Sequence, residues 1–421
     1  MANNWREEEL SREEVIEKYP DFPPLLVLKI DADRRGVHFT DAAFDLVDPK
    51  IHQVSTDGNI HKTKSDGTKK ISPVGLTFRD GTVLCKGHAE IHDYTHRDPY
   101  ILDVVDGKLH LIDQDEVLEE VTFWEKPDFL DKVTSNGTPM SEIATARPQR
   151  ITLTPQIKCH FWDKPGNGCK YCGLFAETRD KEVPDRDEKY FQDVYETVAE
   201  AVKQKGRFCH YHMTSGSTLT GRTEIFDDEV DLYIKTLQAA GRAFKTKKFP
   251  VKLVASAFSK KQLQRLYDET GITTYTTDLE VLNERLFRWV CPGKAEFVGY
   301  RQWKQRLYDA VDIFGRGNVD CGLVGGVELA QPNGFQSEDE ALAAVLKEAD
   351  EIAAHGVSFA EIVWNTIPGS YFYKQKVPSL EYYVRLAAGL AEVRRKNGLN
   401  IYTDDYRRCG NHPNTDLARI D

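Results

Sequence analysis

Three cysteines in one short segment are the residues best suited to chemistry. Cys159, Cys169 and Cys172 follow the spacing Cys-x9-Cys-x2-Cys, and the first gap contains proline and glycine. Proline and glycine let such a loop curl, and the two-residue gap lets the last two thiolates face one metal centre. The segment is therefore predicted to wrap around a metal site.

Two kinds of metal site bind cysteine thiolates in this way. A structural zinc ion takes four protein ligands, so His160, His210 or His212 would have to supplement the three cysteines. Three thiolates on a [4Fe-4S] cluster instead leave one iron open to a substrate or a cofactor. We favour the open iron-sulfur cluster, because open metal sites use fewer protein ligands than structural ones. We predict one cluster, because the other cysteines are not grouped. Zinc binding or a chance spacing is the alternative.

The composition excludes several classes of protein. The chain has 421 residues, of which 40% are hydrophobic and 29% charged, as in a globular protein. Its net charge of -11 disfavours binding to nucleic acid or to anionic membranes. Its acidic N-terminal segment is unlike a secretion signal, and no apolar run reaches the roughly 18 residues that span a bilayer. We expect a cytoplasmic protein whose eight cysteines are thiols or metal ligands.

The elements that must position the cysteines begin near residue 149, where strands and helices alternate. Six strands are predicted, at 150–157, 208–214, 251–257, 273–279, 319–324 and 359–365. Six helices are predicted to follow them, at 188–205, 224–244, 260–270, 301–314, 338–355 and 380–396. Such repeats indicate an α/β fold of parallel strands with right-handed crossovers, as a barrel or an open sheet. The functional site is expected at the carboxyl ends of the strands.

The N-terminal part has a different pattern. A charged helix is predicted over 6–18, and short strands punctuated by turns are predicted at 25–30, 75–78, 82–85, 100–105 and 108–112. We expect three parts: an N-terminal β-rich domain with a leading helix at 1–148, a βα domain at 149–399, and a polar C-terminal tail at 400–421. The tail is a candidate cover for the mouth of a barrel.

The segment Cys169-Lys170-Tyr171-Cys172 resembles half of a known family loop. Radical S-adenosylmethionine (radical SAM) enzymes carry Cys-x3-Cys-x-aromatic-Cys, and residues 150 to 400 are similar to that family. The first gap departs from it, with nine residues instead of three. The resemblance implies a partial (β/α)6 TIM-type barrel in which the three cysteines ligate one [4Fe-4S] cluster. It also implies that SAM chelates the open iron and that Tyr171 lies over the adenine.

A second match follows the second predicted strand. Family members carry a Gly-Gly-Glu-like turn there, whose backbone receives the amino group of SAM, and this chain has Ser215, Gly216 and Ser217. The acid is missing at Ser217, so the amino group must find another carboxylate or only carbonyl groups. An ordinary strand-to-helix turn is the competing interpretation.

The fourth strand resembles the branch of biotin synthase, the thiamine pathway and the hydrogenase maturases. The resemblance implies that Glu280 contacts SAM and that Arg301 pairs with its carboxylate, as a guanidinium fork does well. Taken alone, Arg301 is equally typical of a solvated helix charge.

Two further matches complete the series at strand ends. On the fifth strand, Gly325 and Glu328 fit the family pattern Gly-x-Ile-x-Gly-x-x-Glu, although Cys321 replaces the first glycine. After the sixth strand, Trp364 and Asn365 stand where family members contact adenine and substrate. These positions are the remaining candidates for SAM contacts.

No motif specifies the catalytic side chains. His212 shares a strand face with His210 and is a candidate for proton transfer, with core packing as the competing interpretation. Cys409 is a candidate hydrogen donor or radical shield, with an exposed thiol as the alternative. The single cysteines at 85, 209, 291 and 321 are predicted to be packing residues.

The resemblance implies an enzyme that cleaves SAM reductively to a 5'-deoxyadenosyl radical, which abstracts hydrogen from a substrate. A flavodoxin or ferredoxin would supply the electron. The acidic charge favours a small molecule of cofactor or natural-product biosynthesis, and rearrangement, fragmentation or carbon-carbon bond formation is the expected reaction class. Radical SAM methylation or modification of a peptide or tRNA is one alternative. A non-enzymatic zinc or iron-sulfur binding module is the other.

Overall fold

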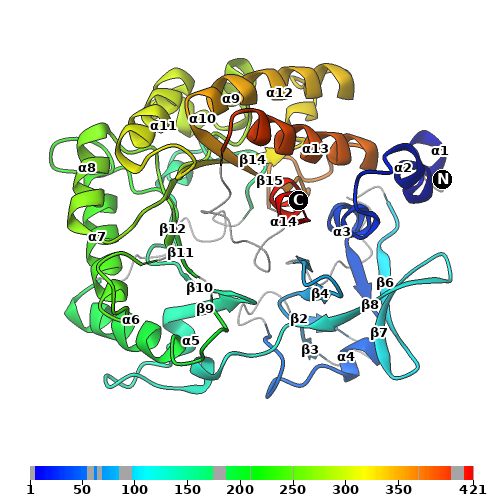
Figure 1. Ribbon diagram of the computed structural model, residues 1–421, viewed down its shortest axis with the longest axis horizontal. Coiled ribbons are helices and arrows are strands. Elements are labelled where there is room, and N and C mark those ends of the chain that lie inside the picture. The colour runs from blue at the N-terminus through cyan, green and yellow to red at the C-terminus, as the bar shows by residue number, and fades with distance from the viewer. Residues whose placement is uncertain are drawn as a thin grey trace.

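The computed structural model describes most of the chain. The described residues are 5–54, 61–63, 69–84, 97–173, 186–208, 210–249, 251–367, 369–399 and 412–420. Two sheets of six and seven strands organise this part of the molecule, and an additional two-stranded ribbon joins β2 (His61–Thr63) to β3 (Lys69–Ile71). The helices and sheets together form a mixed α/β fold (Figure 1).

The seven-stranded sheet runs in chain order. Its strands are β9 (Ala144–Arg147), β10 (Arg150–Leu153), β11 (His210–Thr214), β12 (Val251–Val254), β13 (Tyr275–Thr276), β14 (Val319–Gly325) and β15 (Val357–Val363). Strands β10 to β15 pair in parallel with their neighbours, and β9 pairs with β10 in the antiparallel direction. The six predicted parallel strands are therefore confirmed, and β9, which we had assigned to the N-terminal domain, extends their sheet.

Helices follow the parallel strands and lie in an arc outside them (Figure 1). They are α6 (Glu188–Ala201), α7 (Asp227–Gly241), α8 (Lys260–Glu269), α11 (Tyr300–Phe314), α12 (Glu338–Ala354) and α13 (Leu380–Lys396). Two short helices, α9 (Glu284–Val290) and α10 (Pro292–Phe297), precede α11. Right-handed crossovers between neighbouring strands place successive helices on the same face of a sheet. The six predicted helices are confirmed.

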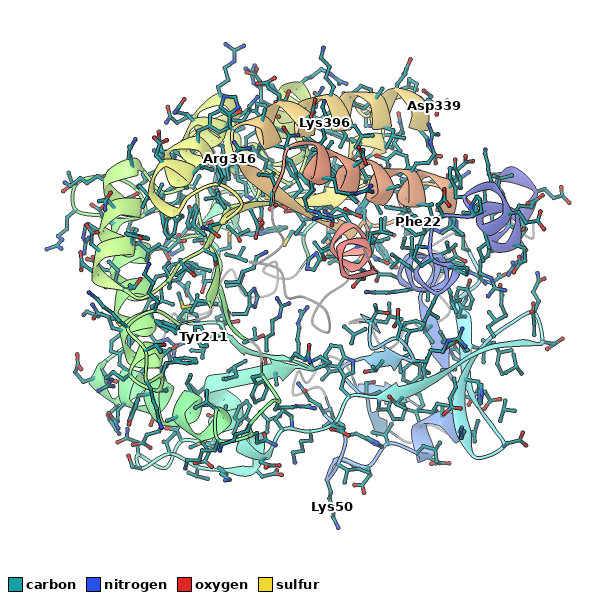
Figure 2. The ribbon with its side chains drawn as sticks, viewed as in Figure 1. Phe22, Lys50, Tyr211, Arg316, Asp339 and Lys396 are labelled. Atoms are coloured by element: carbon teal, nitrogen blue, oxygen red, sulfur yellow. The ribbon has the colours of Figure 1, made fainter. Side chains whose placement is uncertain are left out.

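Serine residues cap the N-termini of three of these helices. Ser259 caps α8 and forms a capping box with Gln262, while Ser337 and Ser379 cap α12 and α13. Such caps satisfy the free N–H groups of the first turn. The apolar faces of the helices then pack on the sheet, where Tyr211 of β11 is fully buried (Figure 2). This packing fixes the strand ends that carry the site.

The six-stranded sheet lies in the N-terminal part, with the order β1-β6-β7-β8-β4-β5. Its strands are β1 (Val37–Phe39), β4 (Leu76–Phe78), β5 (Val83–Leu84), β6 (Tyr100–Val105), β7 (Lys108–Asp113) and β8 (Glu116–Phe123). A second hydrophobic cluster fills one side of this sheet. The short helix α4 (Asp41–Asp45) follows β1, and two short elements, η3 (Asp128–Asp131) and α5 (Met140–Ile143), connect the two sheets.

The predicted N-terminal helix and first strand both need correction. The segment 6–18 forms two helices, α1 (Trp5–Glu8) and α2 (Arg12–Lys18), because Ser11 caps the second one and forms a capping box with Glu14. The predicted strand at 25–30 is wrong, since these residues belong to α3 (Pro24–Arg35). Proline is favoured in the first turn of a helix, and Pro24 is the first residue of α3.

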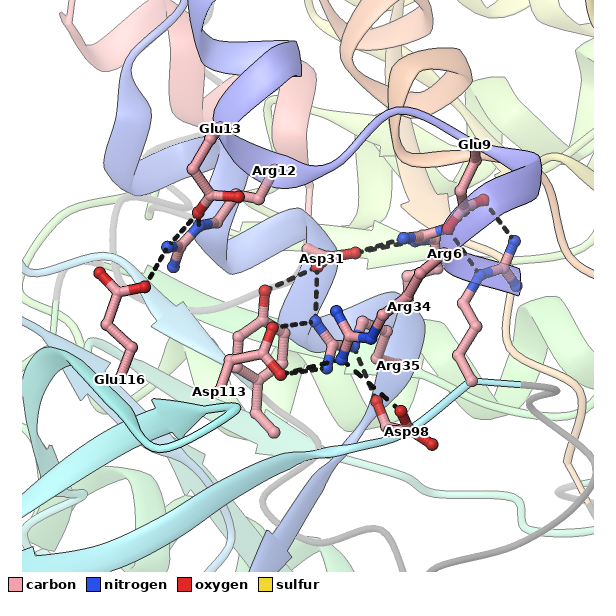
Figure 3. A network of polar contacts seen from close by, with 12 residues as sticks. Arg6, Glu9, Arg12, Glu13, Asp31, Arg34, Arg35, Asp98, Asp113 and Glu116 are labelled. Atoms are coloured by element: carbon pink, nitrogen blue, oxygen red, sulfur yellow. Dashed lines mark hydrogen bonds and ion pairs between the residues drawn. The ribbon is translucent and has the colours of Figure 1, made fainter. Parts of the chain in front are cut away.

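Helix α3 is buried nearly all round and carries charges into the interior. Arg34 donates to Asp31 at 2.5 Å and to Glu9 at 2.7 Å, and Arg35 donates to Asp113 at 2.7 Å (Figure 3). Burial alone would raise the pKa of Asp31, but the two arginines outweigh it and hold that pKa well below its usual range. We call Glu9, Asp31, Arg34, Arg35 and Asp113 the α3 ion network.

The C-terminal helix α14 (Pro413–Ile420) lies against the outer edge of the seven-stranded sheet. The side-chain amide of Asn414 donates to the carbonyl oxygen of Phe359 at 2.7 Å and accepts from the N–H of Glu361 at 3.2 Å. Asn414 therefore occupies hydrogen-bonding groups that β15 would otherwise leave exposed at the edge. Residues 400–411 of the predicted tail lie outside the described residues.

Within the described residues, no helix combines the length and the apolar character needed to cross a membrane.

Candidate functional site

A pocket lies where the parallel strands end, as the strand pattern predicted. Segments that follow β10, β11, β12 and β13 contribute its walls, together with side chains from α10 and α11. The described residues that line it are Cys159, Phe161, Trp162, Cys169, Tyr171, Cys172, Thr214, Ser215, Gly216, Ser217, Val254, Ala255, Ser256, Asp278, Glu280, Lys294 and Trp303. Residues far apart in the chain thus meet at one cavity.

The three cysteines of the predicted metal loop all line this pocket. The loop contains the short helix η4 (His160–Trp162), whose first N–H donates to the carbonyl of Ser217 at 2.9 Å. At Gly216 the loop comes so close that an added Cβ would lie 2.3 Å from the carbonyl oxygen of Lys158. Glycine is therefore required there, because any side chain would push the loop away.

The thiols differ in their surroundings. Burial raises the pKa of Cys159 to about 11. A hydrogen bond from Cys291 lowers the pKa of Cys169, and the nearby charge of Lys294 lowers it further. Cys291, which we had predicted to be a packing residue, therefore contacts the cysteine loop. Cys169 is thus the loop thiol whose ionised form its neighbours favour.

His160 and His212, two histidines that could complete a zinc site, do not line this pocket, whereas the three thiols do. Among the described residues, no group of three or more His, Cys, Asp or Glu side chains is arranged to hold a metal ion. A zinc ion would hold its ligands within about 2.3 Å of one point. The Nδ1 atom of His160 accepts from the N–H of Leu219 at 3.2 Å.

A buried lysine that the sequence analysis missed enters the pocket. Lys294 of α10 donates to Glu280 at 2.6 Å and to the carbonyl of Asp278 at 2.7 Å, and its ammonium lies 4.8 Å from the ring centre of Trp303. Burial raises the pKa of Glu280 despite the lysine. The residue before Lys294 packs closely on the cysteine loop, since an added Cβ on Gly293 would lie 2.7 Å from the carbonyl oxygen of Asn167.

Five of the predicted SAM contacts meet in this pocket: Tyr171, Ser215, Gly216, Ser217 and Glu280. Glu280 has a φ of 69°, a left-handed conformation that is uncommon outside glycine. This backbone turns the chain immediately after the fourth strand, where the resemblance placed an acid. The second and fourth strand ends therefore face the cysteine loop.

Arg301 does not reach the pocket, so its predicted contact with SAM needs correction. Its side chain is 86% exposed, and it pairs with Glu284 at 3.1 Å on the surface. The reason is the position of α11, which begins at Tyr300 and leaves Arg301 in its exposed first turn. Lys294 is the cation that lines the pocket among the described residues.

The predicted contacts on the fifth and sixth strands also lie away from the described lining of the pocket. Glu328 accepts hydrogen bonds from Tyr382 and from the N–H of Gly326, and burial raises its pKa to about 7. An added Cβ on Gly325 would meet Leu386 of α13 at 2.7 Å, so this glycine serves close packing.

Trp364 and Asn365 contact residues outside the pocket. Trp364 is buried with its ring 5.7 Å from that of Phe372, and the amide of Asn365 donates to the carbonyl of Val363 at 3.2 Å. Both follow β15, two strands away from β13. The structure does not bring them to the cysteine loop.

The candidate catalytic residues are only partly described. His212 is buried on β11 and is absent from the pocket lining, and the side chain of His210 lies outside the described residues. Cys409, Cys85 and Cys209 also lie outside the described residues. Cys321 is fully buried and its sulfur accepts from the N–H of Leu279 at 3.4 Å, as expected of a packing cysteine.

Comparison with known proteins gives one significant curated relative. No protein-family model matches the chain. Over 276 residues it is 21% identical to bacteriochlorophyllide c C-7(1)-hydroxylase of Chlorobaculum limnaeum, covering 62% of this chain and 63% of that protein. The chain thus matches less than two thirds of the length of that relative. The similarity to a hydroxylase supports an enzyme of unspecified reaction.

Two solved structures resemble the chain at low similarity. One is a radical SAM methyltransferase from Sphaerobacter thermophilus, with 14% identity and a TM-score of 0.43 over 76% of this chain and 83% of that one. The other is a cobalamin-dependent S-adenosylmethionine radical enzyme, with 14% identity and a TM-score of 0.35 over 76% of this chain and 44% of that one.

Proposed function

We propose that this protein is a radical SAM enzyme that binds one [4Fe-4S] cluster through Cys159, Cys169 and Cys172. The observation that carries the proposal is the convergence of these three thiols on one pocket at the carboxyl ends of parallel strands. The chain-order sheet with its outer helices also supports the partial (β/α)6 barrel. The similarity to a curated hydroxylase adds support for an enzyme.

When bound, the cluster would supply an electron that cleaves SAM, and the 5'-deoxyadenosyl radical so released would take hydrogen from the substrate. The chain would bind and orient SAM. Tyr171 would lie over its adenine, and Lys294 would attract its carboxylate while staying within reach of Glu280. The rings of Phe161, Trp162 and Trp303 would exclude water from the reacting atoms.

The substrate class that we propose is a small molecule of cofactor or natural-product biosynthesis. The net charge of -11 disfavours RNA, and the hydroxylase relative is named for a reaction on bacteriochlorophyllide, a small molecule. A soluble carrier of the flavodoxin or ferredoxin class would reduce the cluster. We place the reaction in the cytoplasm, where iron-sulfur chemistry and free thiols persist.

Anaerobic reconstitution with iron and sulfide tests the proposal directly. The wild-type protein should bind about four irons per chain and convert SAM to 5'-deoxyadenosine when dithionite is added. Alanine at any one of the three loop cysteines should abolish both properties. The matched control is Cys321→Ala, which removes a buried cysteine outside the loop and should keep both.

Two outcomes would contradict the proposal. A brown iron-loaded protein that forms no 5'-deoxyadenosine would instead support a non-enzymatic iron-sulfur binding module. A colourless protein that takes up one zinc ion through the same cysteines would leave a zinc module. Mass spectrometry of candidate substrates would then separate hydrogen abstraction alone from methylation.

A further inference from the structure

A buried carboxyl group stands directly behind the pocket wall that faces the cysteine loop. Glu229, on α7, is 1% exposed. Its oxygens accept from the N–H groups of Thr218 at 2.8 Å and Ser256 at 3.0 Å, and from the hydroxyl of Ser256 at 2.8 Å. Ser256 lines the pocket, whereas Glu229 does not. The carboxyl group therefore acts on the pocket through the serine.

The hydrogen bonds fix the direction of two hydroxyl groups. The oxygen of Ser256 lies 2.8 Å from a Glu229 oxygen and 2.8 Å from the Ser217 oxygen. A hydroxyl has a single hydrogen, and a bond to a carboxylate is about twice as strong as a neutral one. Ser256 therefore donates to Glu229 and accepts from Ser217. Ser217 has then used its hydrogen and presents lone pairs to the pocket.

The groups that donate to Glu229 at these distances are all neutral. Burial raises the pKa of Glu229 to about 7 against the opposing effect of those donors. A positive group that enters the pocket would be attracted to the ionised carboxylate. When Glu229 is ionised, the wall is thus an acceptor surface backed by a negative charge.

We infer that Glu229, acting through Ser256 and Ser217, positions a primary ammonium group in the pocket, and that this is the amino group of the methionine part of SAM. The inference rests on the proposed function. The family turn has an acid at the position of Ser217, which this chain lacks. Glu229 of helix α7 would supply the carboxylate in its place. Glu229 is a positioning residue, since the two serines stand between it and the ligand.

The test measures a preference between two ligands and needs no turnover. S-adenosylhomocysteine and its analogue with hydrogen in place of the amino group are titrated calorimetrically into the iron-loaded protein. The wild type should bind the amino form at least about tenfold more tightly, as loss of a bond to a charged group costs about 1.5–3 kcal/mol. In Glu229→Gln the preference should fall below twofold, with the affinity for the analogue unchanged.

A matched control and a second variant guard against a folding defect. Glu361→Gln removes another fully buried carboxyl, which bonds Asn414 at the β15 edge, and should keep the preference. Ser256→Ala interrupts the hydroxyl chain without changing any charge, and should reduce the preference at least threefold.

The outcomes separate the inference from the function beneath it. A wild-type protein that binds iron but neither ligand overturns the proposed function and the inference with it. A wild-type protein that prefers the amino form, with Glu229→Gln and Ser256→Ala retaining that preference, overturns the inference alone. Weakening of both ligands to the same extent in Glu229→Gln also overturns it, because that pattern reports a damaged pocket.

Discussion

Asp31 and Glu229 are both buried carboxyl groups on helices, yet their surroundings shift the pKa in opposite directions. Asp31 lies within the α3 ion network and faces two arginines, so its pKa falls despite burial. Glu229 faces backbone N–H groups and a hydroxyl, so burial dominates and its pKa rises to about 7. The two pKa shifts differ in direction because the arginines beside Asp31 outweigh its burial, whereas burial is the dominant cause at Glu229.

This difference distinguishes a structural charge from one available to a ligand. The negative charge of a buried carboxylate that pairs with arginines is already compensated within the protein, and removing the carboxylate leaves those arginines unpaired. A carboxylate that meets only neutral donors can still gain from a cation brought by a ligand, and perturbed groups of this kind gather at functional sites. Changes near α3 should therefore affect stability first, and changes near the pocket should affect binding first.

The largest effect is expected from Asp31→Asn. The substitution leaves Arg34 and Arg35 without a buried partner, so the free energy of unfolding should fall by about 3–5 kcal/mol. Urea denaturation at pH 7 measures it. Because the folded pKa of Asp31 lies below its unfolded value, its contribution is present above pH 3.8 and is lost as the pH falls below that value.

The control for Asp31 is Asp98→Asn. Asp98 is 74% exposed beside Arg6 at 3.6 Å, and an exposed pair contributes at most about 1 kcal/mol. An equal loss in the two variants would contradict the assignment of a structural role to the α3 ion network.

A pH dependence of stability should set Glu229 apart from Asp31. Its folded pKa of about 7 lies above the unfolded value of 4.5, so its contribution is complete below pH 4.5 and is lost as the pH rises through 7. The loss should amount to about 3 kcal/mol in the ligand-free protein. Urea denaturation from pH 4.5 to 8 should show this decline in the wild type and a smaller one in Glu229→Gln. Equal declines would place an internal cation beside Glu229.

Lys294 forms an ion pair with Glu280 inside the pocket, and a substitution tests whether this pair serves stability or ligand binding. Lys294→Met removes the pocket cation and should weaken binding of S-adenosylhomocysteine about tenfold, the effect of losing one bond to a charged group. Calorimetry on the iron-loaded protein measures it. Lys304→Met is the control. Lys304 lies on α11 outside the pocket and pairs with Glu348 of α12 at 2.6 Å. A purely structural pair would lower the melting temperature and leave affinity intact.

The smallest effect is expected from Arg301→Ala. Its guanidinium is exposed and pairs with Glu284 away from the pocket. Affinity for S-adenosylhomocysteine should change less than twofold, as exposed pairs contribute little. A tenfold loss in the same titration would restore the SAM contact that the sequence resemblance implied.

The sequence predicted the strands and helices of the second half because their apolar residues repeat with clear periods. It failed at Leu25 to Ile30, where a short apolar run fits a buried strand or a buried helix equally well. Pro24 stands before it, and proline is common both in turns and at the start of helices. Only tertiary contacts, here with α13, select the helix.

The candidate site was predictable where its residues follow one another along the chain. The cysteine spacing and Tyr171 identified the loop, but Lys294 and Glu229 come from helices whose approach depends on long-range packing. Glu229 did leave a trace, since it stands next to Val230 on the apolar face of α7, where an acid is costly to bury. Cys291 left none, because a single cysteine has no spacing to interpret.

The contact between Asn414 and β15 has a consequence for synthesis on the ribosome. Every strand of the seven-stranded sheet precedes α14 in the chain, so the exposed edge at Phe359 and Glu361 is translated before the residue that covers it. Until residue 414 emerges, that edge can pair with strands of neighbouring nascent chains, as exposed edges do. Polysomes that carry many copies of this chain would be the place where such pairing begins.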